Sequence, residues 1–154
     1  MIETPEILQT EAAAAAVIRL VIPRSQMMMA FGPAVGELMA ELARQGVAPV
    51  GAVFARHLAM SPDVFDFELG VKVAAPVTAS GRVKPGELPA ARVARTIYHG
   101  PYEGLPSAWG SFDRWIKANG LAQAQSLWEV YSVGPQSTPD SANWRTELNR
   151  PLKT

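Results

Sequence analysis

The stretch Leu127-Trp128-Glu129-Val130-Tyr131-Ser132-Val133 is typical of a β-strand, because aromatic and β-branched residues occupy most of its positions. It follows an amphipathic helical pattern, in which apolar residues recur at spacings of three and four before the stop Asn119-Gly120. The apolar positions of that helix are Leu105, Ala108, Trp109, Phe112 and Ile116. Strand-like runs lie on both sides, at residues 91–98 and 144–150. The second half of the chain therefore has the order strand, helix, strand, strand.

The first half of the chain has the same order of elements. Residues 17–22 form a strand-like run that ends at Pro23, and an amphipathic helical pattern follows it and stops at Gly46. The apolar positions of this helix are Val35, Leu38, Met39 and Leu42. Two further strand-like runs occupy residues 51–57 and 65–73, and in the later run apolar side chains alternate with polar residues or glycine. Alternation of this kind indicates a strand with one buried face.

The two halves of the chain can be laid over each other. Gly46 falls on Gly120, Leu38 on Phe112 and Phe54 on Trp128, each at a separation of about 74 residues. We therefore expect an α+β fold made of two strand-helix-strand-strand units, at about residues 15–75 and 90–152, within a single domain of residues 1–154. Their strands would form one antiparallel sheet, with two helices on one face and a central ligand groove on the other. Residues 74–89 would be the joint, although they also contain hairpin-like turn signals. The alternative to a duplication is that the same order of elements occurs twice by chance.

Composition and charge narrow the classes of protein to which this chain can belong. The 154 residues are 48% hydrophobic, and 14 basic residues balance 14 acidic ones, which argues against direct binding to nucleic acid or to an anionic membrane. The chain has no cysteine and only two histidines, so we expect no metal site and predict no cofactor. The first eleven residues contain glutamates where a signal peptide would have basic residues. No stretch of the sequence approaches the roughly 20 apolar residues that span a bilayer. These features predict a cytoplasmic protein without a signal peptide.

Glu129 is the strongest candidate for a functional residue. Side chains alternate between the two faces of a strand, so Glu129 and Tyr131 share one face while Trp128 lies on the other. If Trp128 packs beneath the helix with Trp109 or Phe112, Glu129 and Tyr131 must face the ligand groove. A carboxylate beside an aromatic ring attracts a cationic or proton-donating ligand. The alternative is that Glu129 is a solvated acid on an exposed strand face.

Several aromatic and polar residues are candidates for the walls of the groove. Each also has a simpler interpretation, as packing for the aromatic residues and as a surface or core position for the histidine. His57 falls on Tyr131 in the repeat, and Met60 lies close to it in the same half. The full set of predicted ligand-binding residues is Glu129, Tyr131, Tyr98, Tyr102, Trp109, Trp144, His57 and Met60.

The second half of the chain also resembles a known family. The residues that carry the resemblance are Tyr98-His99-Gly100-Pro101-Tyr102 with Leu105, Trp109, Trp115-Ile116, Gly120-Leu121, Trp128-Glu129-Val130-Tyr131, Trp144-Arg145-Thr146-Glu147-Leu148 and Pro151-Leu152. They resemble the GyrI-like, or AraC effector-binding-like, domain, and residues 66–71 resemble its first-half strand more loosely. The resemblance implies a duplicated fold whose central groove binds bulky, often cationic or aromatic compounds. It also implies that a buried strand glutamate, here Glu129, is the main polar contact.

We accordingly expect the protein to sense or sequester hydrophobic, cationic or aromatic small molecules. One alternative is a hydrolase of electrophilic compounds, in which Glu129 activates water or protonates the substrate and a tyrosine such as Tyr131 orients it. Another is a module that docks on a protein partner. The same residues serve the binding protein and the hydrolase, so the sequence leaves open whether the protein is an enzyme.

Overall fold

The computed structural model describes residues 1–61, 63–135 and 137–153, and it is of the α+β class. The chain divides into two compact units. Unit 1 contains residues 1–10 and 91–154, and unit 2 contains residues 11–90. No helix among the described residues is long and apolar enough to cross a membrane.

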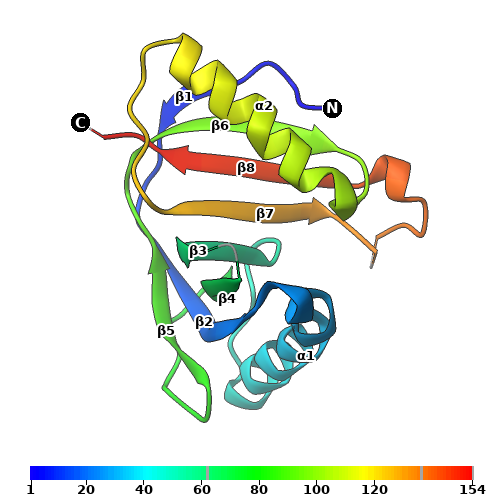
Figure 1. Ribbon diagram of the computed structural model, residues 1–154. Helices are drawn as coiled ribbons and strands as arrows, with labels where there is room; N and C mark the ends of the chain where they lie inside the picture. The colour runs from blue at the N-terminus through cyan, green and yellow to red at the C-terminus, as the bar shows by residue number, and fades with distance from the viewer. Residues whose placement is uncertain (62, 136, 154) are drawn as a thin grey trace. The chain divides into compact units, whose positions relative to one another are not determined.

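Unit 1 is a four-stranded antiparallel sheet with one long helix, α2 (Figure 1). The strand order is β1-β6-β8-β7. The elements are β1 (Glu6–Gln9), β6 (Arg92–His99), the short 3₁₀ helix η2 (Tyr102–Gly104), α2 (Leu105–Ala118), β7 (Leu127–Val133), the 3₁₀ helix η3 (Ser141–Asn143) and β8 (Arg145–Pro151). Helix α2 buries Ala108, Phe112 and Ile116, three of the five apolar positions expected from its sequence. These side chains form a core with Ala94, Tyr98, Leu148 and Leu152.

Unit 2 has the same plan. Its strand order is β3-β4-β2-β5, and its helix α1 packs on β2 and β4. The elements are β2 (Ala13–Pro23), the 3₁₀ helix η1 (Arg24–Gln26), α1 (Met27–Gln45), β3 (Phe54–Met60), β4 (Val64–Lys72) and β5 (Val83–Leu88). Helix α1 buries Ala34, Leu38 and Leu42.

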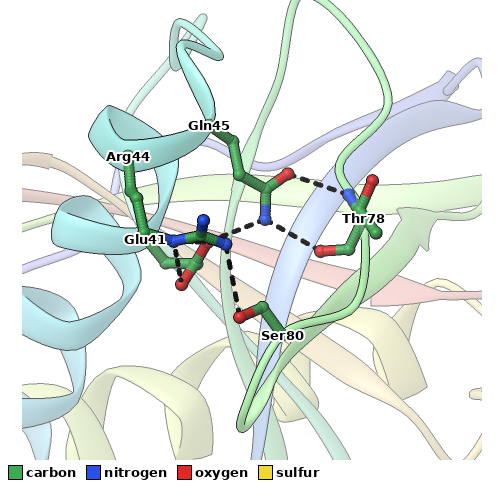
Figure 2. A network of polar contacts seen from close by, with 5 residues as sticks. All are labelled: Glu41, Arg44, Gln45, Thr78 and Ser80. Atoms are coloured by element: carbon green, nitrogen blue, oxygen red, sulfur yellow. Dashed lines mark hydrogen bonds and ion pairs between the residues drawn. The ribbon is translucent and has the colours of Figure 1, made fainter.

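The end of α1 is fixed to the loop that precedes β5 (Figure 2). Gln45 exchanges two hydrogen bonds with the backbone of Thr78, over 2.8 and 2.9 Å. Arg44 donates to Glu41 and, at 3.4 Å, to the hydroxyl of Ser80. The helix then stops at Gly46, whose φ of +70° is the left-handed conformation that favours glycine. This network attaches the loop to the end of the helix.

Strand pairing confirms the duplication that the sequence predicts. Phe54 pairs with Gly70 in unit 2, and Trp128, 74 residues beyond Phe54, pairs with Asn149 in unit 1. A β-bulge interrupts the pairing between His57 and Ala59, and a bulge lies at the matching place between Val130 and Val133. The buried helix positions match in the same way, since Ala34, Leu38 and Leu42 correspond to Ala108, Phe112 and Ile116. Matching bulges are a stronger sign of repetition than matching polarity, because a bulge changes the register of the strand.

Two edge strands were not expected from the sequence. Strand β5 lies inside residues 74–89, which the prolines and glycines had marked as a joint. Among the described strands its ladder partner is β2, and an edge strand tolerates Pro85 because one side of its backbone needs no ladder partner. Strand β1 pairs with β6, so the first ten residues complete the sheet of the distant second half (Figure 1).

Candidate functional site

The side chain of Glu129 lies on the face of the sheet that α2 covers. In the register of β7 and β8, Glu129 pairs with Leu148, which belongs to the core beneath the helix. Trp128 therefore points to the opposite face and does not pack beneath the helix, so the inference that Glu129 faces away from the helix does not hold. Polarity could not settle the orientation, because Trp128 is 2% exposed and Glu129 is only 7% exposed. Both residues are buried, so the alternation of the strand does not show which face the helix takes.

The carboxylate of Glu129 accepts hydrogen bonds from two neutral donors. The indole nitrogen of Trp109 in α2 donates to Oε2 over 2.7 Å, and the hydroxyl of Tyr131 donates to Oε1 over 2.8 Å. Burial raises the pKa of Glu129, and the two hydrogen bonds lower it again in part. A buried carboxylate whose bonded partners are uncharged favours either a proton or a positively charged ligand.

Aromatic rings continue outward from the carboxylate. The ring of Tyr131 makes an edge contact with Tyr102 at 5.6 Å between centroids, and Tyr102 packs on Trp144 at 4.9 Å. Trp144 is held by a hydrogen bond from its indole nitrogen to the carbonyl of Thr138. Burial, and then the charge of Glu129, raise the pKa of the hydroxyls of Tyr131 and Tyr102, so both stay protonated as donors. We call Trp109, Glu129, Tyr131, Tyr102 and Trp144 the aromatic acid cluster.

The bulge in β7 lies beside this cluster. It falls between Val130 and Val133 and so includes Tyr131, two residues after Glu129. A bulge adds a residue to one strand and redirects the side chains near it. The irregular pairing therefore takes part in setting how Tyr131 approaches Glu129.

Tyr98, which the sequence also suggested as a wall, has a different environment. Its side chain is 6% exposed and lies in the core beneath α2, and its hydroxyl donates to the carbonyl of Pro101 over 2.8 Å. The hydroxyl thus contacts the loop that leads to Tyr102.

His57 and Met60 belong to unit 2, on strand β3. His57 is 5% exposed and lies against the rings of Phe65 and Phe67, each at 5.2 Å between centroids. Burial and the nearby charge of Arg24 lower the pKa of His57 to about 4, so the ring is neutral near pH 7. Met60 is the last residue of β3, and its side chain lies outside the described part of the structure.

Arg150 is a neighbour of the cluster that the sequence did not suggest. Its guanidinium lies 5.3 Å from the ring centre of Trp109 and 3.6 Å from the carboxylate of Asp113. Burial lowers the pKa of Arg150. Strand alternation from Leu148 places Arg150 on the helix face, and this signal was present in the sequence.

An open hollow of about 440 Å³ lies elsewhere, in unit 2. Its charged lining residues include Arg19 and Arg82, which form ion pairs with Asp66 and Glu37. With its arginines already paired, this hollow is a weaker candidate than the aromatic acid cluster. No group of three or more metal-ligating side chains occurs among the residues that the structure describes.

Comparison with known proteins identifies a matching family model and solved structures of the same fold. The family model of the GyrI-like small molecule binding domain matches residues 3–153. No curated protein matches the chain. The C-terminal domain of EcmrR has a TM-score of 0.86 and 21% sequence identity, with 98% of each chain covered. SAV2435, in a structure bound to tetraphenylphosphonium, has a TM-score of 0.70 and 10% identity, with 98% of this chain and 94% of that chain covered.

A longer EcmrR chain, in a complex with DNA, has a TM-score of 0.85 and 21% identity. The match covers 98% of this chain but 57% of that one, so the present chain spans little more than half of its length. At these identities the structural likenesses establish the fold.

Proposed function

Because the chain belongs to the GyrI-like small-molecule-binding domain family, we propose that it binds bulky aromatic cations and that Glu129 selects for their positive charge. The observation that carries the proposal is a carboxylate 7% exposed, bonded to two neutral donors and flanked by aromatic rings. A cation at this position would neutralise the buried charge and contact the faces of the rings. SAV2435, which shares the fold, binds the aromatic cation tetraphenylphosphonium, and this likeness supports the choice of ligand class.

Two ions of the same shape and opposite charge test the proposal. Tetraphenylphosphonium and tetraphenylborate both carry four phenyl rings, so a difference in their affinity reports on charge rather than on size. We expect the wild type to prefer the phosphonium, as measured by calorimetric titration. Glu129→Gln should weaken phosphonium binding about tenfold or more, equivalent to about 1.4 kcal/mol, and should leave borate binding equal or stronger.

Glu103→Gln is the matched control. Glu103 lies next to Tyr102 in η2 but is exposed, so its charge is screened by water. This substitution should change the phosphonium affinity less than twofold. An unchanged phosphonium affinity in Glu129→Gln would remove Glu129 from the proposed role.

The raised pKa of Glu129 favours a second function, the hydrolysis of strained electrophiles. In such a reaction water would attack a ring carbon of the substrate as the C–O bond of that carbon breaks. Glu129 would accept the proton of the water and pass it to the oxygen of the opened ring, while the hydroxyl of Tyr131, 2.8 Å from the carboxylate, would orient the substrate. Incubation with an epoxide separates the two functions. An enzyme gives repeated turnover that Glu129→Gln abolishes, whereas a binding protein gives at most one molecule protected per site.

A further inference from the structure

The hydroxyl of Tyr98 organises the loop between β6 and α2. It donates to the carbonyl of Pro101 over 2.8 Å, and the same carbonyl accepts the backbone N–H of Gly104 over 3.1 Å. The loop therefore closes around the hydroxyl oxygen of Tyr98, a residue of the buried core.

Two glycines allow this close approach. A Cβ atom on Gly104 would lie 2.0 Å from the hydroxyl oxygen of Tyr98, and one on Gly100 would lie 3.0 Å from it. Gly100 also has a φ of +134°, a conformation that side chains rarely adopt. A side chain at position 104 would clash with the hydroxyl, and one at position 100 would be strained.

The same loop carries one wall of the aromatic acid cluster and contacts another. Tyr102 follows Pro101 directly, and its ring lies 4.9 Å from that of Trp144 and 5.6 Å from that of Tyr131. The backbone N–H of Gly100 donates to the carbonyl of Trp144 over 3.1 Å. A change in the loop would therefore move both rings with respect to Tyr131.

The duplication supplies an internal comparison. Phe67 and Thr146 are equivalent, because each lies three residues before the strand partner of Phe54 or Trp128. Leu20 pairs with Phe67 and Tyr98 pairs with Thr146, so Leu20 of unit 2 stands where Tyr98 stands in unit 1. Unit 2 nevertheless forms the same strand, 3₁₀ helix and α-helix in succession. The fold therefore does not require a hydroxyl at this position.

We propose that Tyr98 is a positioning residue that holds Tyr102 in the aromatic acid cluster, and thereby sets the affinity for aromatic cations without contacting them. This inference rests on the proposed function of the cluster. It assigns to Tyr98 a different role from that of Tyr102, although both lie in the same motif of the sequence.

A double-mutant cycle tests the inference with tetraphenylphosphonium. Tyr98→Phe removes only the hydroxyl and should weaken binding about three- to tenfold, the effect of about one hydrogen bond. In a Tyr102→Ala background, Tyr98→Phe should have no further effect, because the ring that it positions is absent. Equal affinity of wild type and Tyr98→Phe would overturn the proposal, and so would effects that multiply independently in the double variant.

Thr96→Val is the matched control for loss of a buried hydroxyl. Thr96 lies on the same strand, and its hydroxyl donates to the carbonyl of Glu3 over 2.7 Å, away from the loop. It should lower thermal stability as Tyr98→Phe does but leave the affinity unchanged. A loss of affinity in Thr96→Val equal to that in Tyr98→Phe would reduce Tyr98 to a structural role.

Amide hydrogen exchange gives a readout that needs no ligand. Tyr98→Phe should speed exchange at Gly100 and Gly104, whose N–H groups fix the loop, several-fold more than at Leu148 in β8. Uniform acceleration, or none, would overturn the proposal. If the wild type binds no phosphonium, the proposed function fails, while the exchange rates still decide whether Tyr98 holds the loop.

Discussion

The indole N–H of Trp109 donates to Oε2 of Glu129 over 2.7 Å, and this bond joins α2 to β7. Through this bond the helix is part of the site. The same helix also covers the core, since Phe112, three residues after Trp109, lies fully buried.

Trp109→Phe should keep most of the packing and remove the donor. A buried acceptor that loses its partner costs about 1–3 kcal/mol, so the free energy of unfolding should fall by that amount at pH 7. The pKa of Glu129 should rise further, because the lost bond favours the ionised form. Urea denaturation measures the change, with Trp115→Phe in the same helix as the control. Equal losses in the two variants would contradict a special role for the Trp109 bond.

The pH dependence of stability should report on Glu129. Burial raises its pKa above the ordinary 4.5, so above pH 4.5 the folded protein binds the proton more tightly than the unfolded chain does. The contribution of Glu129 is therefore present in full below 4.5 and is lost as pH rises through the higher folded value. Glu129→Gln cannot ionise, so its stability relative to the wild type should increase between pH 4 and pH 8. Denaturant midpoints at several pH values test this, and a constant difference would contradict it.

His57 should make unit 2 sensitive to acid. Its pKa is lowered from 6.5 to about 4, so its contribution is present above pH 6.5 and is lost as pH falls to about 4. A difference of this size corresponds to about 3 kcal/mol. His57→Phe keeps a ring against Phe65 and Phe67 and should lose less stability between pH 6.5 and 4 than the wild type does. Thermal melts of both proteins between pH 6.5 and pH 4 measure the difference, and equal losses would contradict the role of His57.

Two glycine substitutions in unit 2 should have opposite signs. A Cβ on Gly70 would lie 2.7 Å from Phe54 and 2.8 Å from the carbonyl oxygen of Ala16, so Gly70→Ala should destabilise by about 1–3 kcal/mol. Gly36 is exposed within α1 and has open space around the Cβ position, so Gly36→Ala should stabilise by about 0.5–1 kcal/mol. Thermal denaturation of both variants measures the pair, and loss of stability in Gly36→Ala would contradict the argument.

The amino-acid sequence alone was enough to predict the repeated architecture. Each helix carries its buried residues at helical spacing, and the match of Leu38 with Phe112 and of Gly46 with Gly120 reappears in the structure as equivalent core and stop positions. These features are local, since a helix stripe and a left-handed stop depend on residues close together in the chain. Glu129 could be singled out in the same way, as an acid in an otherwise apolar and aromatic strand.

The face that Glu129 occupies was decided only by the tertiary structure. Trp128 and Glu129 are both buried, so the pairing of Glu129 with Leu148 and the docking of α2 determine which side chain meets Trp109. The separate roles of Tyr98 and Tyr102, and the edge strand within residues 74–89, also depend on pairing partners distant in the sequence. Local pattern fixes the elements, but long-range register decides which side chains they bring together.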